Sequence, residues 1–330
     1  MILSITLILT NLFVFFIITI FYSIIKWIGK WFSIKVKYKK FGLISLSICL
    51  IWTLLALYGY CFGRFCYEIK EVKIEDERIP AAFEDYRIIQ ISDLHISGFI
   101  GHEAFVDTLV NAINRQKPDL ICFTGDLVSI THKEVYPFIK SLQRLKARDG
   151  VISILGNHDY GVYNKQLDNN SDREKERENI IDIQRDSLDW NILLNGNYII
   201  HHGNDSICII GVENQACGVH QVVRRGDLTK ALPKEKVSYS ILLSHDPSHW
   251  KAEVTSHKEI ALTLSGHTHA MQFRILGWTP SKWAYEECDG LYTNGEQKLY
   301  VNIGCGELLP FRIGATPEIT QFTLKRIAKE

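Results

Sequence analysis

The sequence predicts an α/β protein: a sheet-rich body with helices outside, preceded by a hairpin of two membrane-spanning helices. Two long uncharged runs fill most of the first 63 residues, whereas short apolar runs, each closed by a polar cluster, recur from residue 86 to residue 324. Residues 1–67 hold seven Lys and Arg and no Asp or Glu, so 30 basic and 37 acidic residues remain in the rest of the chain. We therefore predict a hairpin over residues 1–66 and a separate body over residues 67–330.

The overall composition excludes several classes of protein. Hydrophobic residues make up 46% of the chain, too many for a disordered protein, and its 22 glycines follow no collagen-like period. The 37 basic and 37 acidic residues give a formal net charge of zero, which indicates no nucleic-acid partner. A chain of 330 residues is long enough to bury a sizeable core.

The two uncharged runs occupy residues 1–25 and 41–63. Each is long enough to cross about 30 Å of hydrocarbon at about 1.5 Å per residue. A cleaved signal peptide is one alternative for the first run, but no basic residue precedes its apolar stretch, which exceeds the usual length. A buried hairpin of a soluble protein is the other alternative, and two uninterrupted runs disfavour it. We predict two transmembrane helices.

The lysines predict the orientation of this hairpin. Six of them lie between Lys26 and Lys40, in the loop that joins the two runs. Four basic residues follow the second run: Arg64, Lys70, Lys73 and Arg78. Because short lysine-rich loops stay in the cytoplasm, we expect the body outside it. The five cysteines of the body, without a CxxC pair, favour buried free thiols and hence a reducing compartment, so the cytoplasmic face is the alternative.

Nine apolar runs in the body predict strands. Five are continuous runs that suit buried strands: Tyr86–Ser92, Asp119–Gly125, Val151–Gly156, Ser240–Ser244 and Ile260–Gly266. Four have alternating or β-branched character: Tyr198–His201, Ser206–Val212, Lys298–Ile303 and Glu318–Leu324. Helical patterns occupy His102–Lys117, Lys133–Ala147 and Pro247–Glu253. A sheet-rich core with helices outside is the assembly that buries these runs.

A strongly polar stretch over residues 168–179 leads into an amphipathic stretch over residues 180–188. We predict a solvated helix on the surface of the body. A cap beside the active site is the alternative.

Polar clusters directly follow the five continuous runs. They are Asp93-Leu94-His95, Gly125-Asp126, Gly156-Asn157-His158-Asp159, Ser244-His245 and Gly266-His267-Thr268-His269. Ligands of open α/β sheets gather at the carboxyl ends of the strands. A single histidine after a strand is usually a packing or loop residue, but five such placements in order predict a site.

These residue types suit a pair of divalent metal ions. Two carboxylates, four imidazoles and one amide oxygen favour Mn, Fe or Zn, and no cysteine takes part. Two cations about 3.5–4 Å apart need a shared carboxylate, for which Asp126 is the candidate. Metal lowers the pKa of a bound water and so provides a hydroxide for attack on phosphorus, while a further imidazole can protonate the leaving oxygen. The glycines allow sharp turns and a close approach to phosphate.

The order D-x-H, GD, GNH[DE], H, GHxH resembles the calcineurin-like metallophosphoesterase superfamily over residues 86 to about 324. The GHTH block and the stretch PFRIGATPEIT are similar to its bacterial membrane-associated branch. The resemblance implies a metallophosphoesterase-type β-sandwich flanked by helices. Relatives often continue GHTH with Gly-Gly-Gln, whereas this chain has Ala270-Met271-Gln272, so we carry over no substrate-loop contacts.

The resemblance also implies roles for single residues. The first metal is expected on Asp93, His95, Asp126 and His269. The second metal is expected on Asp126, Asn157, His245 and His267. His158 is expected to act on the leaving group or the transition state, and Asp159 is expected to orient His158.

Other polar and aromatic residues are weaker candidates. Seven histidines fall outside the five blocks and are expected to be surface or packing residues: His102, His132, His201, His202, His220, His249 and His257. Arg312 is expected to form a surface salt bridge, with a contact to substrate phosphate as the alternative. For Trp278, Trp283 and Tyr285, packing at a sheet edge and lining an apolar substrate groove are equally open.

We predict a membrane-anchored phosphoesterase with two metal ions. It would hydrolyse a phosphomonoester, phosphodiester or pyrophosphate bond, and a lipid-linked phosphate ester is one candidate substrate. The alternative is a non-catalytic scaffold of the same fold that binds metal or phosphate.

Overall fold

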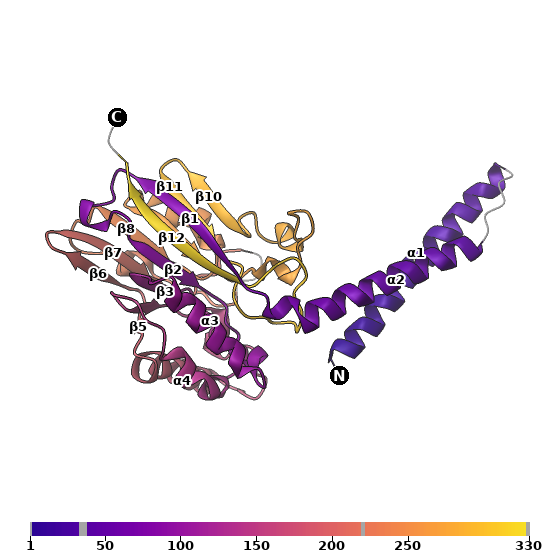
Figure 1. The fold of residues 1–330 in the computed structure, drawn as a ribbon, viewed down its shortest axis with the longest axis horizontal. Coiled ribbons are helices and arrows are strands. Elements are labelled where there is room, and N and C mark those ends of the chain that lie inside the picture. Colours follow the sequence, from indigo (N-terminus) through magenta and orange to yellow (C-terminus); the bar gives the residue numbers. More distant parts are fainter. Residues whose placement is uncertain (1, 33–37, 219–221, 328–330) are drawn as a thin grey trace.

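The computed structural model describes residues 2–32, 38–218 and 222–327. Two apolar helices, α1 (Ile2–Trp31) and α2 (Tyr38–Cys61), project together from one end of a two-sheet body (Figure 1). The N-terminus lies at the end of the hairpin nearer the body, so the chain runs outward in α1 and returns in α2. Part of the lysine-rich loop, residues 33–37, and His220 lie outside the described residues.

The hairpin combines an apolar exterior with a few polar contacts between its helices. Residues 7–31 and 41–65 have mean hydropathy of 2.4 and 2.1 and are long enough to cross a membrane. Nδ2 of Asn11 donates to Oγ1 of Thr53 at 2.9 Å, and Nε1 of Trp52 donates to Oγ1 of Thr10 at 2.9 Å. These contacts satisfy polar groups that hydrocarbon would leave without partners.

Two six-stranded sheets form the body. The first has the order β1 (Glu68–Asp76), β12 (Glu318–Arg326), β2 (Arg87–Ile91), β3 (Leu120–Phe123), β4 (Val151–Ser153) and β5 (Asn191–Ile192). The second has the order β10 (Gly290–Asn294), β11 (Gln297–Val301), β9 (Ile260–Ser265), β8 (Tyr239–Leu243), β7 (Asp205–Gly211) and β6 (Gly196–His202). All nine predicted strands are present, and β1, β5 and β10 are additional.

The sheets are mainly parallel at their centres. Strands β2, β3, β4 and β5 pair in parallel, as do β7, β8, β9 and β11. The carboxyl ends of the parallel strands in each sheet therefore meet at one edge, from which the predicted site residues emerge.

The core has three layers of apolar side chains. One layer fills the space between the sheets with residues such as Ile88, Ile209 and Leu264. The outer face of the first sheet packs on α3 (Glu103–Arg115) and α5 (Asn170–Asp182) through side chains such as Leu109 and Ile180. The outer face of the second sheet packs on α6 (Leu228–Ala231) and α7 (Ser248–Ala252). The predicted sandwich flanked by helices is confirmed.

One predicted helix is wrong in its extent. Residues 133–147 contain a 3-10 segment, His132–Phe138, and only a single α-helical turn, α4 (Ile139–Leu142). Pro137 lacks a backbone N–H and disrupts the α-helical hydrogen-bond pattern there. The carboxylate of Glu134 instead accepts the N–H groups of Ser129, Ile130 and Thr131 at 2.7–3.1 Å.

The end of α2 is attached firmly to the body. The N–H of Arg312 donates to the carbonyl of Gly59 at 3.2 Å, and a Cβ on Gly63 would lie 2.1 Å from the carbonyl oxygen of Arg312. Arg64 and Glu307, both buried, form an ion pair at 2.8 Å. The hairpin therefore joins the body through backbone contacts and a buried charge pair, in addition to the covalent link.

Candidate metal centre

The predicted ligands lie at the carboxyl ends of β2, β3, β4, β8 and β9, on loops with unusual backbone. Five of the seven have positive φ: Asp93 (50°), His95 (39°), Asp126 (58°), His267 (75°) and His269 (50°). Left-handed backbone is unfavourable for residues other than glycine and concentrates at functional sites. The conformation turns each side chain back across the end of the sheet, towards the others.

The glycines between these residues allow the loops to pack against one another. A Cβ on Gly156 would lie 2.2 Å from Oδ1 of Asp126, and one on Gly125, at φ 95°, would lie 2.4 Å from the nitrogen of Gly156. The space beside them is filled by the neighbouring loop. Gly125 and Gly156 therefore allow two ligand-bearing loops to approach each other closely.

A first group of side chains consists of Asp93, His95 and His269, whose ligand atoms lie within 4.8 Å of one another. Nε2 of His269 lies 3.4 Å from Oδ1 of Asp93, and Nε2 of His95 lies 3.5 Å from Oδ2 of Asp126. All four side chains are buried. Asp126 is thus in reach of this group, as predicted for the shared carboxylate.

A second group consists of Asp126, His245 and His267, also within 4.8 Å. Oδ1 of Asn157 lies 3.1 Å from Nε2 of His245 and 2.8 Å from Nδ1 of His267. Nε2 of His245 lies 3.2 Å from Oδ2 of Asp126. The structure therefore brings all seven predicted ligands together in two adjacent groups, and Asp126, a member of the second group, lies within 3.5 Å of His95 in the first.

The donor and acceptor pattern fits bound cations. Nδ1 of His245 lies 2.7 Å from the carbonyl of Thr124, which can only accept, so Nδ1 carries a proton and the ring, once neutral, would present Nε2 as an acceptor. That Nε2 faces the oxygens of Asp126 and Asn157, which are acceptors too. Nε2 of His95 and Nε2 of His269 are buried without a hydrogen-bond partner. Converging acceptors and unpartnered ring nitrogens are what a divalent cation requires.

The pKa values of the clustered side chains show that a positive charge beside Asp126 is stabilised. Burial alone would lower the pKa of His245, but the Asp126 carboxylate outweighs it and raises that pKa to about 10. Burial lowers the pKa of His95 to about 3 and raises the pKa of Asp93 to about 6. Burial opposes ionisation of Asp126, yet His245 and His158 together lower its pKa well below its ordinary value. In the protein alone, the anionic Asp126 is therefore paired with a protonated His245, so a positive charge already lies beside this carboxylate.

His158 lies next to the first group. Its backbone N–H donates to Oδ1 of Asp126 at 2.8 Å, and its Nδ1 lies 2.8 Å from the carbonyl of Ser129, so that nitrogen carries the proton. The ring makes an edge contact with His95 at 4.7 Å and stacks on Tyr163 at 4.1 Å between centroids. Nε2 is then the nitrogen that remains for proton exchange in the cleft.

We expected Asp159 to orient the His158 ring, but its carboxylate bonds to backbone groups instead. Its buried carboxylate accepts the backbone N–H groups of Asp126, Leu127, Val128 and Gly156 at 2.9–3.3 Å. Four amide donors can satisfy a buried carboxylate without a second side chain. Asp159 therefore holds the two ligand-bearing loops together, and the carbonyl of Ser129 orients His158.

The expectation that Arg312 forms a surface salt bridge was wrong, because its side chain is buried. Its guanidinium donates to the carbonyls of Ile303, Gly304, Gly306 and Ala315, and Nη2 lies 3.2 Å from Nδ1 of His269. It supports the loop behind His269. Nothing in the local sequence indicates this role, since the partners are backbone groups of a folded loop.

A cleft of about 640 Å³ lies at the two groups. Its lining combines polar residues of the site, Asp126, His158, His267 and His269, with the apolar Met271, Leu308 and Leu309. Two tyrosines also line the cleft: the hydroxyl of Tyr163 contacts Nδ2 of Asn157 at 2.9 Å, and that of Tyr285 contacts Nε2 of His267 at 2.6 Å. Tyr285 therefore belongs to the site, as one of the two alternatives held, whereas Tyr163 was missed.

The polar stretch at 168–179 was expected to form either a surface helix or a cap beside the site, and most of it lies in α5. The helix lies on the surface and packs through Ile180 and Ile181, as predicted. The preceding loop, however, carries Tyr163 into the cleft. Tyr163 lies outside the polar stretch, and no described residue of that stretch lines the cleft, so α5 is the predicted surface helix.

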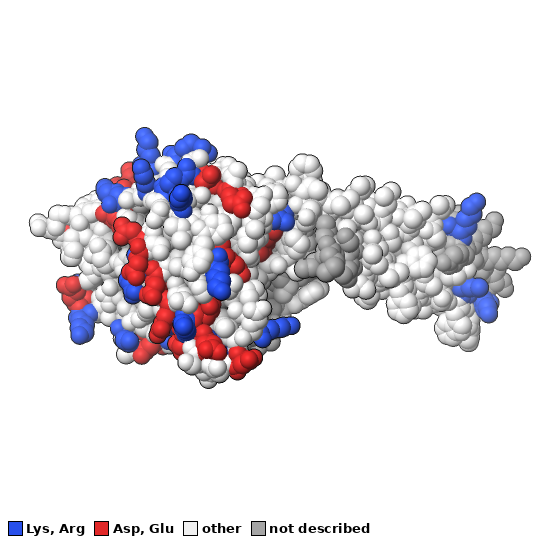
Figure 2. Space-filling model, turned by 90° about the horizontal axis from the view of Figure 1, so that it is seen from below, with Lys and Arg blue, Asp and Glu red and all other residues white. Residues whose placement is uncertain are grey.

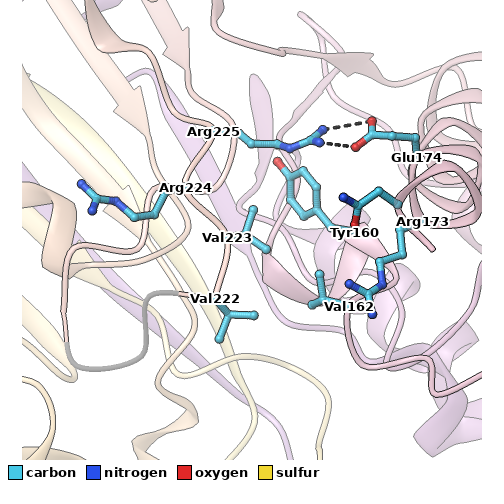
Figure 3. Close-up of a pocket in the computed structure, with 9 residues that line it drawn as sticks. Tyr160, Val162, Arg173, Glu174, Val222, Val223, Arg224 and Arg225 are labelled. Carbon is cyan, nitrogen blue, oxygen red and sulfur yellow. Dashed lines mark hydrogen bonds and ion pairs between the residues drawn. The ribbon is translucent and has the colours of Figure 1, made fainter. Parts of the chain in front are cut away.

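A second hollow of about 320 Å³ lies beside Tyr160 (Figure 3). Arg225 and Glu174 face one another across it in a two-pronged ion pair. The predicted ligands do not line it. Among the other histidines, His249 is buried between Ser244 and Glu253, at 2.9 and 2.8 Å, and has the expected packing role.

Comparisons with known proteins identify relatives of this chain. Residues 86–271 match the family model described as Calcineurin-like phosphoesterase. The metallophosphoesterase YkuE of Bacillus subtilis (strain 168) is 31% identical over 277 residues, which cover 81% of this chain and 90% of YkuE. The transmembrane protein with metallophosphoesterase domain of Bos taurus is 26% identical over 294 residues, 88% of this chain and 64% of that relative. The solved NAD nucleotidase of Haemophilus influenzae aligns at TM-score 0.44 and 14% identity, over 67% of this chain and 45% of that chain.

The two-sheet sandwich and the clustered carboxylates and imidazoles define a metal-dependent hydrolase of phosphoric esters. The family model covers more than half of the chain, which therefore belongs to the calcineurin-like phosphoesterase family. The predicted resemblance and the predicted enzyme class are both confirmed. The apolar helices and the transmembrane relatives indicate membrane association.

Proposed function

We propose that this protein is a membrane-anchored phosphoesterase with two divalent metal ions, in which residues 1–66 form the anchor and residues 67–330 the catalytic domain. The observation that carries the proposal is the pair of adjacent ligand groups, with Asp126 in contact with His95 of one group and His245 of the other. Asp93, His95, Asp126 and His269 would hold one ion. Asp126, Asn157, His245 and His267 would hold the other. When bound, Mn, Fe or Zn ions supply Lewis-acid charge and lower the pKa of water.

The residues around the ions would position and protonate the substrate. His158 presents Nε2 to the cleft because Nδ1 is held by the carbonyl of Ser129. It would give a proton to the leaving oxygen or stabilise charge that develops there. Tyr163 stacks on the His158 ring and so limits its rotation, while Asp159 keeps the loop that carries Asp126 in place.

The anchor suggests the substrate class. A phosphomonoester, phosphodiester or pyrophosphate linked to a lipid would be held near the cleft by the same membrane that holds α1 and α2. The orientation that the lysine-rich loop favours places the body outside the cytoplasm. A protease-accessibility assay on intact cells tests this orientation, since digestion of the body without lysis requires it to be exposed there.

The decisive experiment measures turnover and metal content of the purified full-length chain. After chelation and reloading with Mn, we expect hydrolysis of an aryl phosphomonoester or phosphodiester and about two metal ions per chain. Asp126→Ala should lose turnover and metal, whereas Asp182→Ala, an exposed residue at the end of α5, should keep both. Equal activity of wild type and Asp126→Ala, with or without metal, would refute the proposal.

A second assay addresses the substrate class. Turnover of a detergent-solubilised lipid phosphate is compared with turnover of its water-soluble head group. A lower KM for the lipid form supports a lipid-linked substrate. Equal constants for both forms would assign specificity to the head group alone.

A further inference from the structure

The loop between β9 and β10 exposes an unusual number of apolar side chains. From Ala270 to Trp283 it contains no Asp or Glu and two basic residues. Five of its apolar side chains are exposed: Met271, Ile275, Leu276, Trp278 and Trp283. Leu308 and Leu309, in another loop at the mouth of the same cleft, are about half exposed. We call these seven residues the apolar rim.

A tight turn at the tip of the loop exposes Leu276 to solvent. Ile275 and Trp278 exchange two backbone hydrogen bonds of 2.9 Å, which close a two-residue turn over Leu276 and Gly277. Both turn residues have positive φ, 49° and 78°, which glycine tolerates and leucine does not favour. The Leu276 side chain is fully exposed, and Trp283, at 80% exposure, packs edge-on against Trp278 at 5.2 Å. A strained turn that presents a leucine to solvent is costly unless something covers it.

The position of the loop indicates what covers it. At its base, the ring of Phe273 lies 6.4 Å from the ring of Trp52 in α2. Trp52 precedes the end of α2 at Cys61 by nine residues, which is about 13 Å along the helix axis at about 1.5 Å per residue. Phe273 therefore contacts α2 well inside the span that is apolar enough for a membrane, residues 41–65. In Figure 1 the loops that follow β9 and β11 lie at the end of the body from which α2 emerges.

The charges agree with a lipid surface. Figure 2 shows acidic and basic groups distributed over the body, while the hairpin carries no charged group until its far end. In the loop itself, Arg274 pairs with Asp289, and Lys282, next to Trp283, is exposed. Exposed tryptophans beside a lysine are typical of segments that enter the boundary between headgroups and acyl chains.

We propose that the apolar rim inserts into the membrane interface as a second contact, in addition to the hairpin. The proposal rests on the membrane anchor of the proposed function and goes beyond it. Met271, Leu308 and Leu309 line the cleft, so this insertion places the mouth of the cleft at the bilayer surface. The body is then held in one orientation relative to the membrane.

Quenching of single tryptophans by brominated lipids tests the proposal. The full-length chain is reconstituted into vesicles with bromine on the acyl chains, and emission is compared between wild type and Trp→Phe variants. Subtracting the variant from the wild type isolates the emission of one residue. Trp283→Phe reports on the rim, Trp52→Phe on the hairpin, and Trp250→Phe, a core residue at 3% exposure, is the matched control.

We expect the Trp283 and Trp52 components to lose most of their emission to bromolipid and the Trp250 component to lose none. If Trp52 is quenched but Trp283 is quenched only by aqueous acrylamide, the rim lies in water, and this inference fails while the anchor stands. If Trp283 is shielded from both quenchers, a protein such as a second copy of the chain covers the rim, and the inference fails. If Trp52 is not quenched by bromolipid, the anchor and the inference fail together.

Discussion

The hairpin and the edge of the sandwich depart from the usual arrangement of a soluble protein in opposite ways. In the hairpin, large apolar side chains are exposed, with Phe13 at 63% and Leu46 at 67%. At the sandwich edge, Asp93, His95 and His245 are fully buried. Exposed apolar groups and buried charged groups are each unfavourable in water. Each region therefore agrees with the proposed function, in which lipid surrounds the hairpin and cations occupy the sandwich edge.

The two regions also differ in how they are held. The ligands depend on many precise contacts between loops, such as the four amides that satisfy Asp159. The hairpin has few polar contacts between α1 and α2 and depends on apolar surface, which is not directional. Single substitutions should therefore affect the metal centre strongly through geometry, and the hairpin mainly through transfer free energy.

The largest effect is expected at His158. His158→Gln removes the imidazole while it leaves the seven ligands, so metal content should stay at the wild-type level and kcat should fall by about 10²–10⁴. Steady-state kinetics and metal analysis on the same sample check this. Unchanged kcat with full metal content would contradict the role of His158 in proton transfer.

The second largest effect is expected when a charged residue is placed in the hairpin. Leu50→Arg places a guanidinium on an exposed position within the apolar span of α2, and transfer of arginine to the centre of a membrane helix costs about 3 kcal/mol. The fraction of the chain in the membrane pellet should fall, or the body should be released more easily by detergent. Leu291→Arg, on the exposed face of β10, is the matched control and should behave as wild type. Equal effects of the two would show that α2 is not in lipid.

Arg312→Lys should weaken the metal centre to a smaller extent. Lysine cannot replace a planar group that donates to four carbonyls behind His269. Loss of a group that supports a ligand costs about 10–100-fold in metal affinity. Metal titration followed by activity measures this, and a thermal melt of the metal-free chain shows whether the fold itself is weakened. An unchanged metal affinity would mean that the loop behind His269 is held without Arg312.

The smallest effect concerns acid stability at His249. Burial lowers the pKa of His249 below its ordinary value, against the attraction of Glu253 and Asp246, while His257 lowers it further. The unfolded chain then binds a proton at a pH where the folded chain does not, so stability falls as the pH drops below about 6.5. Melting curves of wild type and His249→Gln should converge between pH 7 and pH 5. A constant difference across that range would show that His249 ionises equally in both states.

Much of this architecture could be predicted because its signals are local in the sequence. Each ligand block directly follows an apolar run, so one short segment provides both a buried strand and the polar group at its end. Strand β1 was missed, although residues 68–76 alternate, because its partner β12 lies about 250 residues later in the chain. The prediction of a helix over residues 133–147 was wrong because it relied on the helical spacing of apolar residues and gave too little weight to Pro137.

The sequence by itself determined the two kinds of region, nine of the twelve strands, the proposed ligand set and the family, since all depend on residue type and short spacing. The tertiary structure alone decided which residues support the site. Arg312 is buried behind His269, Tyr285 meets His267, and Phe273 meets Trp52 only because distant loops converge at one end of the sandwich. Such contacts depend on how strands far apart in the chain pair, and pairing is a property of the folded sheets.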